Sequence, residues 1–504
     1  MKNTVWTGVI LLCCSVNSWG QCRAAPPPNG AQILAASSSG PTASFSVADR
    51  GAITFDTEGG AGSPMVGYAR LQTSSGTTPS AYLTFQSKLN GILIGQASVG
   101  ATAPILSGRI YAEVGGPVNT GVAIANPNGT GATVTYYFTD ANGQNSPSAS
   151  FPLAANAQTS VFLTEAPFNV GAFLNGTMTF SSSIPISVIA LRSYLNERGE
   201  SLITTLPVTN LTTSTSAGGT LYLPHFADGG GWKTQVVLVN PSDSATSGFV
   251  QFFSTGSGSV AGQPLNLTVE GQLGSTFTYS IPARSSVRLA TAGLGGVIVP
   301  GSVRITSTAG TTPTALAIFT NHGSGFTVSE AGVPSVIPST AFRMYEYDCG
   351  DYKGQIQTGV AITNPGATAV NVNIELTELW GAPAGFNVTI PVPANGQVAR
   401  FLRELIPSLP YPFHGVARVS SSSPIAVTAL RGDYNTRNDF LITTALPTSE
   451  SAPANSADAI FPELVDLGGY TTSFVLYSGV AGQVSTGVLS FYARDGSPLP
   501  LNLD

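Results

Sequence analysis

The segment SSSIPISVIALR at residues 181–192 recurs almost unchanged as SSSSPIAVTALR at residues 420–431. The two copies are offset by 431 − 192 = 239 residues, and other phrases repeat at nearly the same distance. One of them, GVAIANP at 121–127, also has an intermediate copy, VVLVNP at 236–241. Self-similarity at a fixed period indicates that the chain reuses one module, and a spacing of about 115 residues is the size of a small domain.

Two types of unit, which we call X and Y, alternate along the chain. The sequence FPELVDLGGYTTSFVL at 461–476 repeats LPHFADGGGWKTQVVL at 223–238, so another X unit begins near the end of the chain. The pattern predicts the rear half of an X unit at 44–105, a Y unit at 107–210, an X unit at 220–337, a Y unit at 341–447 and the front half of an X unit at 459–504.

The two half units have two explanations. We expect a sequence truncated after Asp504, because an uncovered hydrophobic strand edge promotes aggregation and natural chain ends normally avoid one. Alternatively, the tail of one molecule completes the head of another by strand addition, which would give a filament.

Each unit has the sequence pattern of a sandwich of short strands. Val134, Tyr136 and Phe138 alternate with Thr and Tyr, and the run ends in the turn sequence DANG at 140–143. Seven or eight such runs per unit, spaced by roughly 8–12 residues, are typical of β-sandwiches. We therefore predict an all-β protein of tandem immunoglobulin-like antiparallel β-sandwich domains in an elongated array, with a turn or two of helix within 398–406.

Composition and charge exclude several classes of function. Lys and Arg number only 20 and the net charge is −6, so the clustered basic residues of a nucleic-acid-binding protein are missing. No nucleophile elbow, HExxH motif, phosphate-binding loop or dinucleotide fingerprint occurs, and we predict no enzymatic activity and no cofactor other than a possible calcium ion.

The N-terminus predicts export. Residues 1–20 have a short positive start, an apolar run and small residues near a cleavage site, and a Pro/Ser-rich linker follows at 21–43. We expect a secreted or cell-surface protein with no transmembrane span beyond the signal segment, whose apolar run is too short to serve as one. Of the cysteines, Cys22 and Cys349 would remain; they either pair or, as their different units favour, stay unpaired.

Loop carboxylates suggest candidate calcium ligands. Asp228 and Asp466 are equivalent positions in Gly-rich loops, and Asp348 and Asp351 lie in a similar Y-unit loop. Carboxylates between domains can hold Ca²⁺. A turn aspartate needs no metal, however, and this second interpretation is favoured because few acids converge in any one loop.

Two further stretches could mark ligand sites. Arg431, Gly432 and Asp433 spell a tripeptide that resembles an integrin-binding motif in a possible loop, although Arg192 occupies the same repeat position without that motif. Trp380 lies in a predicted turn and could stack on a sugar. Trp232 and Tyr470 are further aromatic candidates, but their Y-unit counterparts are aliphatic, which favours a core contact.

The order GVAIANP, PLAANAQ, PISVIALR and LITTLP, with PANGQVARFL at 393–402, resembles uncharacterised secreted bacterial proteins made of tandem immunoglobulin-like β-sandwich repeats. The resemblance implies fold and export, and it carries over no site residues. We expect a non-catalytic extracellular repeat protein acting as a spacer, adhesin or surface-layer component, with a cell-surface glycan or protein as a possible partner. The alternative is a set of accessory carbohydrate-binding modules of a longer secreted hydrolase.

Overall fold

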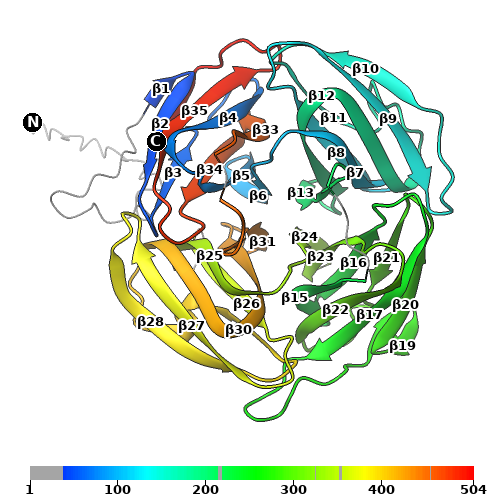
Figure 1. The fold of residues 1–504 in the computed structure, drawn as a ribbon, viewed down its shortest axis with the longest axis vertical. Helices are drawn as coiled ribbons and strands as arrows, with labels where there is room; N and C mark the ends of the chain where they lie inside the picture. Colours follow the sequence, from blue (N-terminus) through cyan, green and yellow to red (C-terminus); the bar gives the residue numbers. More distant parts are fainter. Residues whose placement is uncertain (1–37, 214–217, 324, 351–354, 455) are drawn as a thin grey trace, which may run out of the picture.

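The computed structural model describes residues 38–504 except 214–217, 324, 351–354 and 455, and it is almost entirely β-structure (Figure 1). The predicted signal segment, Cys22 and Asp351 lie outside the described residues. The helix α1 (Leu402–Leu405) is one short turn within the predicted stretch 398–406, and a strand precedes it. Within the described ranges, no helix is long and apolar enough to cross a membrane.

The complete X unit, unit 3 (220–334), is a two-sheet antiparallel sandwich. One sheet has the strand order β15 (Thr220–Asp228), β22 (Val299–Ala309), β17 (Thr246–Ser254) and β20 (Thr276–Ile281). The other has the order β21 (Ser286–Ala290), β16 (Trp232–Val239), β23 (Thr314–Gly323) and β24 (Phe326–Pro334). A small hairpin joins β18 (Leu267–Val269) to β19 (Gln272–Gly274). Val236, Phe252 and Ile305, from both sheets, share one buried core.

The Y units have the same layers, but a single long strand runs through both sheets. Unit 2 (105–210) has one sheet of β14 (Val208–Asn210), β7 (Ile105–Val114), β12 (Leu174–Leu195), β9 (Ala132–Asp140) and β10 (Ala149–Leu153). Its other sheet contains β11 (Gln158–Phe162), β8 (Val118–Ala125), β12 again and β13 (Ser201–Leu206). The pairing of β12 with β7 is interrupted between Ser181 and Ile186. The repeated phrase at 181–192 is therefore where the strand passes from one sheet to the other.

Unit 4 (339–449) repeats this arrangement. Its first sheet has β32 (Thr448–Ser449), β25 (Ser339–Asp348), β30 (Phe413–Tyr434), β27 (Val370–Glu378) and β28 (Pro383–Val392). Its second sheet has β29 (Gln397–Phe401), β26 (Ile356–Thr363), β30 again and β31 (Phe440–Ala445).

Unit 1 is built from both ends of the chain. One sheet has β33 (Ala459–Asp466), β4 (Met65–Gly76), β35 (Ser485–Ala493) and β2 (Thr42–Val47). The other has β3 (Ala52–Asp56), β34 (Tyr470–Tyr477), β5 (Ser80–Leu89) and β6 (Ile92–Gly100). The terminal strands β1 (Ser38–Gly40) and β36 (Leu501–Leu503) also pair. The two half units predicted at 44–105 and 459–504 thus complete each other within one chain, and neither is left with an open edge that another molecule must cover.

The four units form a closed ring, so the predicted elongated array is wrong (Figure 1). The physical reason is that unit 1 cannot cover its strand edges unless the chain ends meet, and this meeting closes the circle. Strands β6, β13, β24 and β31, one from each unit, lie nearest the centre, and each packs against the next.

A recurring joint connects neighbouring units. In every unit a residue in the left-handed conformation precedes the edge strand of the second sheet; these residues are Arg50, Asn156, Arg284 and Asn395, with φ of 61°, 56°, 65° and 49°. A turn from the preceding unit packs on each of them. At three joints a backbone N–H donates to that turn, from Ala52 to Leu379 O, from Gln158 to Arg494 O and from Gln397 to Thr255 O, each at 2.9 Å. At the fourth, Ser285 Oγ donates to Asp140 O at 2.6 Å.

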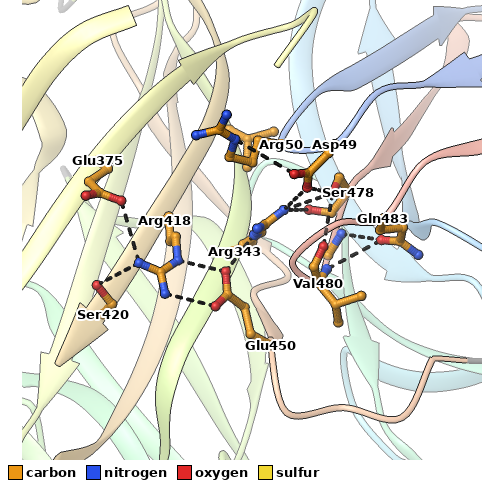
Figure 2. A network of polar contacts seen from close by, with 12 residues as sticks. Asp49, Arg50, Arg343, Glu375, Arg418, Ser420, Glu450, Ser478, Val480 and Gln483 are labelled. Carbon is orange, nitrogen blue, oxygen red and sulfur yellow. Dashed lines mark hydrogen bonds and ion pairs between the residues drawn. The ribbon is translucent and has the colours of Figure 1, made fainter. Parts of the chain in front are cut away.

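The joint between units 4 and 1 also contains an ion-pair network centred on the buried Arg343 (Figure 2). Arg343 Nε lies 2.6 Å from Glu450 Oε1, and its Nη1 lies 3.1 Å from Asp49 Oδ1 of unit 1. Arg343 Nη1 also donates to Ser478 Oγ at 2.9 Å. Arg418 forms a second pair with Glu450 at 2.8 Å. The guanidinium of Arg343 therefore connects the last complete unit to segments from both ends of the chain.

The Asn-Pro motif of the repeats is structural. The Asn240 side-chain nitrogen donates to Ser244 O at 2.8 Å and to Pro282 O at 2.9 Å, and Asn126 and Asn364 make the corresponding bonds in the Y units. Each asparagine is fully buried and joins two loops. In unit 1 Ser478 stands at this position, and the Gln483 side chain bridges the loops by accepting from Gly479 N and donating to Thr78 O.

Candidate binding cleft between units 3 and 4

A cleft of about 530 Å³ lies at the junction of units 3 and 4. This volume is within the range of small-molecule sites, which are typically concave and mainly apolar with a few polar groups. Aliphatic residues of both units form much of its lining. The aromatic residues are Trp232, Phe319, Phe401 and Phe440, and the polar ones are His225, Thr255, Gln397, Arg400 and Glu404.

The aromatic wall is assembled from both units. Trp232 is the first residue of β16, after three glycines with positive φ that allow the tight turn. Its ring lies 6.5 Å from that of Phe440 at an interplanar angle of 71°, and Phe440 in turn lies 6.3 Å from Phe401 at 84°. Edge-to-face contacts of this kind stabilise a fixed arrangement of rings.

His225 and Gln397 form the polar centre of the cleft. The amide Nε2 of Gln397 lies 2.9 Å from His225 Nδ1, and the imidazole stacks on Phe319 with ring centroids 5.6 Å apart. Burial lowers the pKa of His225 to about 4, so the ring is neutral at physiological pH. Gln397 is 2% exposed, and the described residues offer its amide oxygen no hydrogen-bond partner.

The charged residues of the cleft are directed to the backbone. Glu404 Oε2 accepts from the Phe401 N–H at 2.8 Å, next to α1, and Arg400 Nη1 donates to Ala399 O at 3.0 Å. Beside the cleft, a loop exposes Leu294 and Val297, which are 64% and 78% exposed. Arg400 and Glu404 are both exposed, so the charges of the cleft lie at its border, next to this apolar loop, and its interior is neutral.

The equivalent junction between units 1 and 2 has a different chemistry. Glu463 replaces His225, and Ser160 replaces Ala399. Ser160 Oγ donates to Glu463 Oε1 at 2.7 Å, and Arg494 Nη2 donates to Ser160 O at 3.2 Å. Burial raises the pKa of Glu463, while the bond from Ser160 opposes the rise. Polar contacts thus join these two units where the other junction presents His225 and apolar side chains.

The predicted Arg431-Gly432-Asp433 motif is not in a loop. These residues lie within β30, between β26 and β31, and pair with both strands. Asp433 is buried, and burial raises its pKa to about 6 although the charges of Arg431 and Lys88 oppose the rise. Gly432 lines the cleft. A strand paired on both sides cannot present the tripeptide as a loop motif does.

The calcium candidates have local structural roles. Asp228 Oδ1 accepts from Gly293 N at 2.7 Å, and its equivalent Asp466 accepts from Gly59 N at 3.0 Å. Asp348 Oδ1 accepts from Gly350 N at 3.2 Å. Across the part of the chain that the structure describes, no three His, Cys, Asp or Glu residues are grouped so that they could hold a metal ion.

The remaining sequence candidates lie elsewhere. Trp380 is half-buried in the turn between β27 and β28, where the neighbouring Leu379 and Gly381 contact unit 1. Cys349 is buried and takes part in a disulfide, so the expectation that it is unpaired is wrong. Trp232 packs against the core of unit 3, as the sequence predicts, and it also lines the cleft. In the sequence, the signal for this site is the difference between two equivalent positions of the X units, which hold His225 in one copy and Glu463 in the other.

No family model matches the chain, and no curated protein matches it. Among solved structures, that of the infectious bursal disease virus Gx strain is 8% identical, with 90% of this chain and 82% of that chain covered and a TM-score of 0.11. The Gt strain is 9% identical, with 97% and 86% covered and a TM-score of 0.11. TM-scores this low do not correspond to a common fold, and they carry no argument about function.

Proposed function

We propose that this protein is a non-catalytic extracellular binding protein of the adhesin type, in which four immunoglobulin-like sandwiches form a rigid ring that presents the cleft between units 3 and 4. Export would depend on the segment at 1–20. The cleft carries the proposal, because it combines a preformed aromatic wall with a small polar centre. The repeated joints support it, since they would hold the two walls of the cleft in a fixed relation.

Carbohydrate binding is the second candidate. Trp232, Phe401 and Phe440 are aromatic side chains of the kind on which the apolar face of a sugar can stack. In that case the chain would supply accessory modules to a secreted hydrolase. The small number of polar groups in the cleft favours the first candidate, because a sugar's hydroxyl groups would be left without partners.

A binding screen tests the proposed function. The labelled chain is applied to arrays of cell-surface proteins and of glycans, beside the double variant Trp232→Ala/Phe440→Ser. Serine occupies the equivalent position 201 of unit 2, so the second change is compatible with the fold. Trp380→Ala is the matched control, since it removes an aromatic side chain at another junction.

We expect the unmodified chain to bind protein spots on the array. The double variant should bind them at least about tenfold more weakly, as is typical when central aromatic residues of an interface are removed, and Trp380→Ala should bind them as the unmodified chain does. Cleft-dependent binding to glycans alone would favour the carbohydrate alternative. Binding that is equal in all three proteins would contradict the cleft assignment.

A further inference from the structure

We infer that the cleft between units 3 and 4 takes an uncharged, mainly apolar group of its protein partner that carries one hydrogen-bond acceptor, which His225 Nε2–H contacts. This inference rests on the proposed binding function and adds the chemistry of the ligand. Three observations carry it: the hydrogen bond of His225, the neutral interior of the cleft and the contrast with the equivalent junction.

The orientation of the Gln397 amide assigns the proton of the neutral ring to one nitrogen. An amide nitrogen can only donate, so His225 Nδ1, 2.9 Å from Gln397 Nε2, must accept. In a neutral imidazole the proton is then on Nε2. The described residues offer Nε2 no hydrogen-bond partner, and His225 lines the cleft. The cleft therefore has an unused donor that matches a carbonyl, ether or hydroxyl oxygen.

The interior disfavours a charged ligand. The carboxylate of Glu404 accepts a backbone hydrogen bond, and the Arg400 guanidinium donates one at the border. Placing an anion or cation among Phe319, Phe440 and the aliphatic lining would remove its water without supplying a counter-charge. An uncharged ligand with an apolar body avoids this cost.

Of the two equivalent junctions, only the one between units 3 and 4 presents a neutral donor in an apolar setting. Glu463 and Ser160 bond to each other there, whereas His225 and Ala399 leave the corresponding place apolar and provide a single neutral donor. The loop exposing Leu294 and Val297 extends the apolar surface next to the cleft.

Three probes of similar shape test the chemistry in the full chain at pH 7. Acetophenone has an apolar ring and a carbonyl acceptor, α-methylstyrene has the same shape without the acceptor, and benzoate is charged. Ligand-observed NMR titrations should give acetophenone an affinity about fivefold above that of α-methylstyrene, the contribution of one hydrogen bond, and weaker binding of benzoate. In His225→Phe, which retains an aromatic ring against Phe319, the preference for acetophenone should disappear.

A measurement on the unmodified protein avoids any folding defect of the variant. The chain has 3 histidines, so selective ¹⁵N labelling can resolve the His225 imidazole. We expect the Nε2–H tautomer and an Nε2 shift on adding acetophenone but not α-methylstyrene. The Nδ1–H tautomer, tighter binding of benzoate, or an acetophenone preference that survives His225→Phe would overturn the inference. Cleft-dependent binding on the arrays without probe binding would overturn it while leaving the proposed function in place.

Discussion

Arg198 of unit 2 and Asp439 of unit 4 form an ion pair between two units that are not neighbours in the ring, with Nη2 and Oδ2 2.9 Å apart. The contact is reciprocal, because Arg437 Nη1 lies 2.7 Å from Glu200 Oε1. The four residues occupy equivalent positions of the two Y units. The same hairpin sequence, present once in each Y unit, thus supplies both ion pairs that connect the two units across the ring.

This connection predicts energetic coupling between the Y units. In a double-mutant cycle, Arg198→Ala and Asp439→Ala should each destabilise the protein, and their coupling energy should be about 1–3 kcal/mol because both side chains are largely buried. Chemical denaturation measures it. Arg400→Ala, an exposed arginine, is the control and should change stability by less than about 0.5 kcal/mol. Strictly additive effects of the two substitutions would show that the pair does not join the units.

We expect that replacing the buried Glu346 by a neutral side chain stabilises the protein in a pH-dependent way. Its side chain is fully buried, neither carboxyl oxygen has a hydrogen-bond partner in the described part of the chain, and Ala112 stands at the equivalent position of unit 2. Burial, with a smaller effect of Asp348, raises the pKa of Glu346 well above its ordinary value. A carboxyl group whose pKa is higher in the folded than in the unfolded protein favours folding most at pH values below the unfolded-state pKa, where it is protonated in both states. This contribution of Glu346 to stability is lost as the pH rises through the folded-state pKa.

Glu346→Gln should therefore match the unmodified protein near pH 4 and exceed its stability at pH 7–8. Thermal unfolding across this range measures the difference, with Glu375→Gln, an exposed glutamate of the same unit, as the control. An equal effect of Glu346→Gln at both pH values would contradict burial of an ionisable carboxyl.

Ring closure predicts a monomer. Because β33–β36 cover the edges left by β2–β6, the chain 38–504 should show no concentration-dependent association in light scattering. Deleting 459–504 should expose those edges and cause aggregation or oligomer formation. Head-to-tail oligomers of the undeleted chain, abolished by the deletion, would instead support strand exchange between molecules.

We expect a large loss of stability when the asparagine side chain of an Asn-Pro motif is removed. Asn240→Ala removes the donor for Ser244 O and Pro282 O in a fully buried setting, and should cost about 2–4 kcal/mol. Ser242→Ala, in the same loop but only partly buried, is the control and should cost under about 1 kcal/mol. A loss below about 1 kcal/mol for Asn240→Ala would mean that water replaces the side chain.

Part of the candidate site was accessible from the sequence. The aliphatic counterparts of Trp232 in the Y units predict its contact with the core but not its place in the cleft. Its role depends on Phe440, more than 200 residues away in the chain, whose ring completes the wall. The Arg431-Gly432-Asp433 tripeptide shows the opposite case, since the local sequence allows a loop and pairing with β26 and β31 makes it a strand.

The sequence by itself determined the strand-rich modules and their alternation, because a period-2 pattern and a fixed repeat are local properties that each stretch such as 181–192 carries on its own. Only the tertiary structure decided that the array is closed. Whether β4 pairs with β33 depends on the summed geometry of the intervening joints, each set by contacts between units. The cleft follows from the same cause, since His225 and Gln397 belong to different units and meet only when the ring places them together.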